Sequence, residues 1–126
     1  MTSGAVTDDI AQVCIDWMRR MNGVCLPEIE KWAARRGIPV RGDRTLDAGR
    51  ENLVLWVGVS DQFCDLLNAV RGSAQVVLRP MSDAEALVVH GCYRHARVPA
   101  LPTAKRPPSG GYREPHWLPT YWEVLP

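Results

Sequence analysis

The chain has 126 residues, of which 46% are hydrophobic and 23% are charged. These values are ordinary for a globular protein, so they exclude a wholly disordered chain and predict one domain with a substantial hydrophobic core. The net charge of +1 excludes a strong electrostatic field of either sign. No apolar run approaches the ~18 residues of a membrane span, and the N-terminus lacks a signal-peptide pattern. We therefore expect a soluble, cytoplasmic protein that does not contact membranes.

The first helix is predicted to begin at an N-cap, Thr7, and to end at the Asn-Gly pair of residues 22–23. Its apolar residues recur with the spacing of one helical face: Ile10, Val13, Cys14, Trp17, Met18 and Met21. This spacing makes it the most clearly marked helix of the chain.

A second helix is predicted after a short extended piece at residues 24–26. Pro27 suits the first helical position because the N–H that proline lacks would be unpaired there, and Gly37 ends the helix. Its predicted buried face is Ile29, Trp32 and Ala33. The remaining side carries charges of both signs, which we interpret as a solvated face: Glu28, Glu30, Lys31, Arg35 and Arg36. Residues 40–52 are mostly polar and are predicted to form a surface loop.

Residues 53–92 organise the predicted fold. The apolar run at residues 53–57 predicts a strand that is covered on both faces. Ser60 is predicted to cap a helix that ends at a left-handed Gly72 and buries one apolar face: Phe63, Leu66, Leu67 and Val70. Two β-favouring runs follow at residues 76–78 and 87–89, and the polar segment between them predicts a β-hairpin.

The last 34 residues, 93–126, are dense in proline. Proline lacks the N–H needed in a central strand, so this segment is predicted to run extended over the surface. Trp117, Tyr121 and Trp122 nevertheless supply apolar area that is unfavourable to leave in water. We expect the end of this arm to dock on the core, with residues 121–125 as an edge strand.

The four cysteines, Cys14, Cys25, Cys64 and Cys92, are widely separated. Their spacing favours reduced, packed thiols over a disulfide framework, although it leaves a two-bridge arrangement open. His90, Cys92 and His95 are close enough in sequence to begin a zinc site. No second half-site accompanies them, so a hairpin end with a packed thiol is the favoured interpretation.

Motifs for enzymatic chemistry are missing. Ser60 follows a strand and opens a helix, as the nucleophile of a G-x-S-x-G motif does, but position 62 is Gln. The N-cap role accounts for Ser60 with fewer assumptions. No glycine-rich phosphate-binding motif is present. We therefore predict a protein that is not an enzyme, with no catalytic residue, no metal and no cofactor.

The predicted order of helix, extended piece, helix, helix and β-hairpin over residues 7–92 resembles a winged helix-turn-helix domain. The resemblance implies that the helix before the hairpin enters the major groove of DNA and that the hairpin, or wing, contacts the DNA backbone. The reading helix would be residues 60–70, and the wing would centre on residues 79–85.

The predicted nucleic-acid site combines this helix, the hairpin tip and the arm. Gln62 and Asn68 carry groups that hydrogen-bond adenine edges. The basic side chains neutralise phosphates, and those of the arm are interleaved with aromatic residues on which bases stack. The same arm could instead cover the core with its aromatic residues while its charges keep it soluble. The predicted set is Gln62, Asn68, Arg71, Arg79, Arg94, Arg97, Lys105, Arg106 and Arg113.

The sequence thus predicts an α+β fold of three main helices, a short strand and a β-hairpin, winged-helix-like, in a core of residues 1–92. The proline-rich arm, residues 93–126, docks on that core. The predicted function is a small non-enzymatic nucleic-acid-binding or regulatory module with DNA as its partner. The alternative is a protein-protein interaction module that uses the same helix and hairpin surface and the Trp-rich arm, because near-neutral charge does not oppose such contacts. A homodimer is compatible with both.

Overall fold

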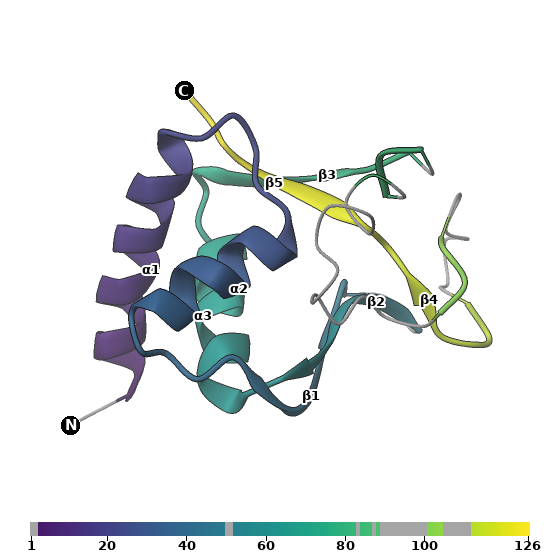
Figure 1. Ribbon diagram of the computed structural model, residues 1–126, viewed down its shortest axis with the longest axis horizontal. Coiled ribbons are helices and arrows are strands. Elements are labelled where there is room, and N and C mark those ends of the chain that lie inside the picture. Colours follow the sequence, from purple (N-terminus) through teal and green to yellow (C-terminus); the bar gives the residue numbers. More distant parts are fainter. Residues whose placement is uncertain (1–2, 50–51, 83, 87, 89–100, 105–111) are drawn as a thin grey trace.

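A computed structural model describes residues 3–49, 52–82, 84–86, 88, 101–104 and 112–126. Three helices lie together on one side of the molecule in Figure 1: α1 (Ser3–Arg19), α2 (Leu26–Arg35) and α3 (Asp61–Arg71). One sheet contains β1 (Arg41–Asp47), β2 (Leu53–Val59) and β4 (His116–Trp117), and the other pairs β3 (Val76–Pro80) with β5 (Thr120–Val124). The protein is therefore of mixed α+β class, as predicted. None of the helices in these ranges has the length and apolar character to cross a membrane.

Helix α1 is present as predicted, but its start and its buried face differ from the prediction. It begins at Ser3, so Thr7 lies inside the helix, since no proline interrupts the preceding residues. The buried residues of α1 are Ala11, Cys14, Ile15 and Met18. Val13 and Met21, which the spacing placed on the buried face, are 43% and 40% exposed. The buried stripe is thus rotated toward α3, against which α1 packs.

The capping residues of α2 and α3 act largely as the sequence predicts. Pro27 lies in the first turn of α2. Ser60 Oγ accepts a 2.9 Å hydrogen bond from the Phe63 N–H and donates to the Pro39 carbonyl at 2.6 Å, so the hydroxyl is occupied as an N-cap. Gly72 does not adopt the predicted left-handed conformation: its φ is −75°, because its N–H still bonds to the Asn68 carbonyl as the helix ends.

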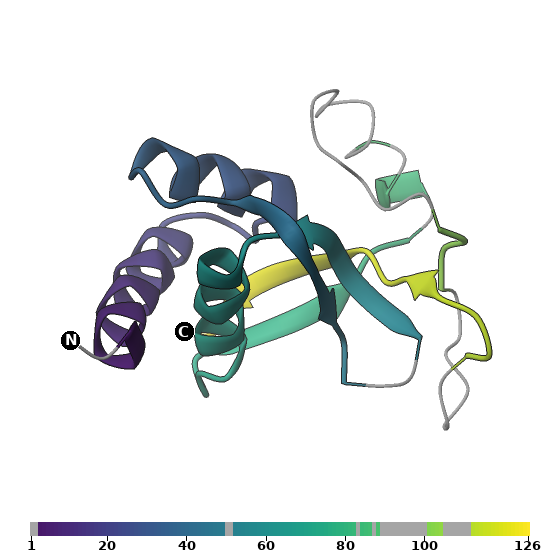
Figure 2. The same cartoon turned by 90° about the horizontal axis from the view of Figure 1, so that it is seen from below.

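The predicted surface loop at residues 40–52 contains strand β1. This strand pairs antiparallel with β2 through an irregular register, and Leu46 is its one buried residue. A strand exposed on nearly every residue shows no alternation of apolar and polar side chains, so the sequence carries no period-2 signal. Strand β2 itself is covered as predicted, with four successive buried residues at its start. Figure 2 shows α3 lying between α1 and this β1–β2 pair.

The predicted hairpin of residues 76–78 with 87–89 is wrong. Strand β3 pairs with β5 instead, from Val76 opposite Val124 to Pro80 opposite Thr120. Residues 84–86 and 88 are helical, while residues 87 and 89 lie outside the described part. The local cause is a capping box: the Ser82 N–H bonds to Glu85 Oε1 and the Glu85 N–H bonds to Ser82 Oγ, at 3.0 and 3.2 Å. The segment expected to be the tip of a wing thus begins a helical turn.

Strand β5 occurs within one residue of the predicted position, as one of the two strands of its sheet, and an isolated bridge adds to its free side. Val24 and Trp122 exchange backbone hydrogen bonds of 3.0 and 2.7 Å on the side of β5 away from β3. Residues 120–124 contain no proline, so every N–H of this stretch is available to pair. Trp122 is fully buried and Trp117 nearly so, and both belong to the main core. The division of the chain into a core of residues 1–92 and an arm stays a prediction.

Candidate functional site

The two polar residues predicted to read DNA lie on the exposed side of α3. Gln62 and Asn68 are both exposed, and so are Asp61 and Asp65 of the same helix. Asp61 lies 3.4 Å from Arg44 of β1, but both side chains are mostly in water, where such a pair contributes little. A phosphate approaching α3 would therefore meet two carboxylates.

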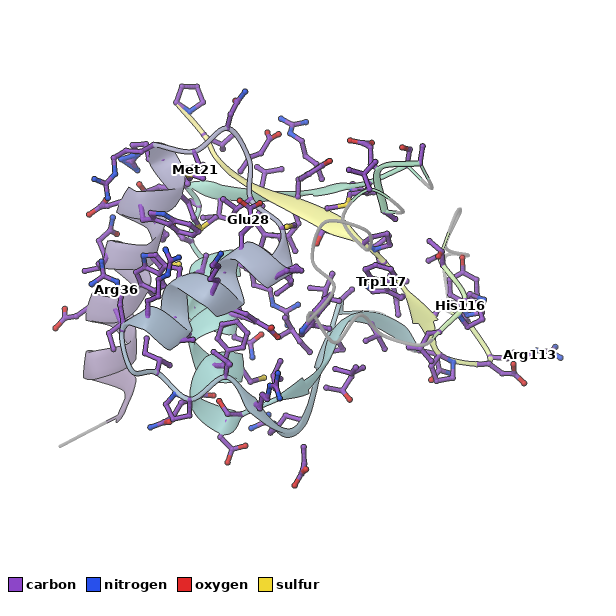
Figure 3. All side chains as sticks on the ribbon, in the orientation of Figure 1. Met21, Glu28, Arg36, Arg113, His116 and Trp117 are labelled. Atoms are coloured by element: carbon purple, nitrogen blue, oxygen red, sulfur yellow. The ribbon has the colours of Figure 1, made fainter. Side chains whose placement is uncertain are left out.

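The predicted basic residues within the described part come from three separate regions of the fold. Arg71 donates a hydrogen bond to the Asp47 carbonyl, and Arg79 forms an ion pair with Glu123 on the neighbouring strand. Arg113 is exposed near β4, on the opposite side of the view in Figure 3 from Arg36 of the helices. Two of these three cations are thus already engaged within the chain.

The remaining predicted positions lie outside the described residues. They comprise the basic residues Arg94, Arg97, Lys105 and Arg106 and the histidine-cysteine cluster His90, Cys92 and His95. Among the described residues, no group of three or more His, Cys, Asp or Glu side chains is arranged to hold a metal ion. His116 instead stacks on Tyr112 with ring centroids 3.7 Å apart.

A groove of about 630 Å³ lies between α1 and α2. Figure 3 shows Met21 just beyond the C-terminal end of α1, Glu28 in the first turn of α2 and Arg36 at the C-cap of α2. Within the groove the rings of Trp17 and Trp32 stack, with centroids 5.7 Å apart and an interplanar angle of 23°. The guanidinium of Arg36 lies over the Trp32 ring, 4.6 Å from its centroid. The lining residues are Trp17, Met21, Glu28, Lys31, Trp32, Arg35 and Arg36.

Helical spacing explains how these side chains come to face one space. The five lining residues of α2 recur at i, i+3, i+4, i+7 and i+8, which places them on a single side of the helix. On the other side, Trp17 belongs to α1 and Met21 follows two residues after that helix ends at Arg19. One wall of the groove is therefore a side of α2, and the other is the C-terminal end of α1 with the turn that follows it.

The walls carry more positive than negative charge. Lys31, Arg35 and Arg36 contribute three positive charges and Glu28 one negative charge, which leaves +2. Glu28 is also partly committed elsewhere, because its Oε1 accepts hydrogen bonds from the N–H and the thiol of Cys25, at 3.1 and 3.2 Å. An anionic group entering the groove would therefore be attracted more than repelled.

Sequence reasoning assigned these residues elsewhere. Trp17 and Met21 were expected in the core, and the charges of α2 were expected on a solvated face. The available signal was the combined spacing of Lys31, Trp32, Arg35 and Arg36, which puts aromatic and basic side chains on one side of a helix. Nothing in the sequence indicated that α1 would leave an open space opposite that side.

The described cysteines are buried, and burial raises the pKa values of Cys14 and Cys25 to about 12. At pH 8 roughly one thiol in 10⁴ would be ionised, whereas an unfolded thiol has a pKa of about 8.5. We expect both to react with iodoacetamide far more slowly in the folded protein than in urea, as measured by peptide mass spectrometry. Rapid labelling of the folded protein would contradict this packing.

The pKa values of Cys14 and Cys25 are higher in the folded than in the unfolded protein. These thiols should therefore favour folding below pH ~8.5 and lose that contribution as the pH rises toward 12.

Comparison with protein-family models, with curated proteins and with solved structures finds no match to this chain.

Proposed function

We propose that this protein is a non-enzymatic binding module that recognises another protein through the groove between α1 and α2. The observation that carries the proposal is the groove itself, with its tryptophan pair, its half-exposed Met21 and its basic rim. Aromatic, Met and Arg side chains are the types enriched where proteins contact one another. A volume of about 630 Å³ accommodates several side chains of a partner.

The state of the tryptophans favours a protein over a nucleic acid in this groove. Trp32 is only 8% exposed, because Trp17 and Arg36 already lie against its ring. A base could stack on Trp32 only by displacing one of them, which opposes the use of this ring as an open stacking platform. An aliphatic or aromatic side chain entering beside Met21 requires no such displacement.

The proposal is tested by panning a random peptide display library on the purified full-length chain. We expect selected peptides to bind wild-type protein and to lose at least about tenfold in affinity for Trp17→Glu and Met21→Glu, which place a charge in the groove. Leu125→Glu is the matched control, since Leu125 is 41% exposed and Met21 is 40% exposed. Circular dichroism establishes that each variant folds. Peptides that bind both groove variants as tightly as wild type, or a library that yields no binder, would refute the proposal.

A second candidate is nucleic-acid binding by a winged-helix architecture, which the chain connectivity favours. The order α1, Val24, α2, α3, β3, β5, with β5 between Val24 and β3, follows the element and strand order of a winged helix. In that arrangement β1 and β2 are an insertion between α2 and α3, and residues 81–119 connect the two wing strands. Fold-level likeness alone is a weak basis for function, and the carboxylates of α3 oppose phosphate.

This second candidate is separated from the first by titrating duplex and single-stranded DNA at low and moderate salt. Micromolar binding that weakens steeply with salt, and that disappears when Arg79, Arg94, Arg106 and Arg113 are replaced together by alanine, would favour it. We expect no such binding through α3. The double variant Gln62→Ala with Asn68→Ala serves as the probe of that helix, because both side chains are exposed and their loss should not disturb the fold.

A further inference from the structure

We infer that the groove between α1 and α2 binds an acidic amphipathic helix of a partner protein. This inference rests on the proposed function and specifies the chemistry of the partner. Two parallel requirements follow from the walls: an apolar face must cover Trp17 and Met21, and negative charge must meet the basic rim.

The shape of the groove matches a helix. One wall is a side of α2 and the other is the C-terminal end of α1, so the space between them is a groove of the kind that receives a third helix. The ten residues of α2 extend about 15 Å, which is nearly three turns of a partner helix. Opposite α2, the groove is closed by Trp17 of α1 and by Met21 just after that helix.

The apolar requirement is visible in the exposure of these side chains. Among the described residues, the large hydrophobic side chains that stay exposed are Val13, Met21, Val88 and Leu125, of which Met21 lines the groove beside the half-buried Trp17. Covering Met21 and Trp17 removes apolar area from water at a gain of about 25 cal/mol per Å². An apolar residue at every third or fourth position of a partner helix would supply that cover.

The charge requirement selects an acidic partner. Lys31 and Arg35 are exposed, four residues apart on the same side of α2, and neither has an ion-pair partner among the described residues. A neutral or basic helix would displace water from these cations without supplying a carboxylate to pair with them, and such desolvation is unfavourable. Carboxylates on either side of the partner's apolar stripe would form ion pairs with Lys31 and Arg35 and so offset this desolvation.

The chain itself offers no such segment. Residues 89–100 and 105–111 contain basic side chains and no Asp or Glu. In a second copy, exposed acidic residues lie on α3 (Asp61 and Asp65) and on α1 (Asp9 and Asp16), but most of the large apolar side chains of both helices are buried in their own core. The occupant that fits both the charge and the apolar stripe is therefore a separate protein.

The test uses three designed helical peptides of about four turns. The first has leucine on one face and glutamate on the others, the second replaces glutamate by lysine, and the third keeps glutamate but replaces leucine by serine. We expect the first to bind wild-type protein at least about tenfold more tightly than either of the others, with an affinity that falls as salt rises. Intrinsic tryptophan fluorescence reports binding, because Trp17 and Trp32 line the groove.

Charge reversal locates the interaction. The double variant Lys31→Glu with Arg35→Glu should weaken binding of the acidic peptide by about tenfold or more and strengthen binding of the basic one. Its matched control is Arg41→Glu with Arg44→Glu, which changes the net charge equally on exposed positions of β1. Equal binding of acidic and basic peptides, or equal effects of the two double variants, would overturn the inference.

The outcomes also distinguish this inference from the proposed function. If display-selected peptides bind the groove but the acidic peptide does not, the function stands and the partner chemistry is wrong. If neither binds, both fail. If sedimentation shows a dimer that Met21→Glu dissociates and Leu125→Glu does not, the occupant is a second copy and the inference is overturned.

Discussion

Replacing Trp122 by alanine should lower the free energy of unfolding by roughly 3–5 kcal/mol, the usual cost of truncating a fully buried tryptophan. Trp122 is 0% exposed, and its indole N–H donates a 3.0 Å hydrogen bond to Thr120 Oγ1. Its backbone joins β5 to Val24, which lies two residues before the start of α2. The change therefore leaves a large cavity at the point where the last strand meets the helices. The free energy of unfolding of a domain is usually about 5–15 kcal/mol, so this loss is a large share of the total stability.

Urea titration followed by circular dichroism measures this loss. Leu125→Ala is the control, because Leu125 lies three residues later and is 41% exposed, so its truncation should cost less than about 1 kcal/mol. If Trp122→Ala were as stable as Leu125→Ala, the end of the chain would not be part of the core in solution.

The second large effect is expected at Gly42, in the exposed strand β1. A Cβ atom at this position would lie 2.6 Å from Ser60 Cα and 2.8 Å from the Val59 carbonyl oxygen, both of them backbone atoms. Backbone yields less readily than the end of a flexible side chain, so β1 would have to move away from the junction of β2 and α3. We expect Gly42→Ala to cost roughly 1–3 kcal/mol, as overpacking does elsewhere.

The same junction holds the start of α3, because the Ser60 N–H bonds to the Val40 carbonyl at 3.0 Å. Gly42→Ala should therefore also increase hydrogen exchange of the amides in the first turn of α3. Asp43→Ala, at the next and exposed position of the strand, should change neither stability nor exchange appreciably. Equal stabilities of the two variants would show that β1 is not fixed against Ser60.

The proposed groove and the face of α3 are separate surfaces, and their charges differ in sign. The groove lining sums to +2, whereas α3 exposes Asp61 and Asp65. Binding at one surface is therefore not expected to mimic binding at the other. Variants of Lys31 and Arg35 address the groove, and variants of Gln62 and Asn68 address the helix, without overlap.

The sequence by itself determined the local elements that have strong local causes. The spacing of Phe63, Leu66, Leu67 and Val70 together with the Ser60 cap specified α3, and the apolar run before it specified β2. Pro27 likewise marked the start of α2. These features depend on interactions within a few residues, which the order of side chains records directly. The helical turn at residues 84–86 also has a local signal in the sequence, the Ser82–Glu85 capping box, although the sequence pattern predicts a hairpin for this segment.

Only the tertiary structure decided which strands pair and which helical side stays open. The pairing of β3 with β5 joins residues 40 to 48 positions apart, and no local preference distinguishes this partner from a nearer one. Strand β1 is held by its hydrogen bonds to β2 rather than by an apolar face of its own. The groove arises because α1 turns Ala11 and Ile15 to the core, which leaves Trp17 and the following Met21 beside the space that α2 lines. That choice between two adjacent faces of one helix is made by what packs against it, and one chain segment does not contain that information.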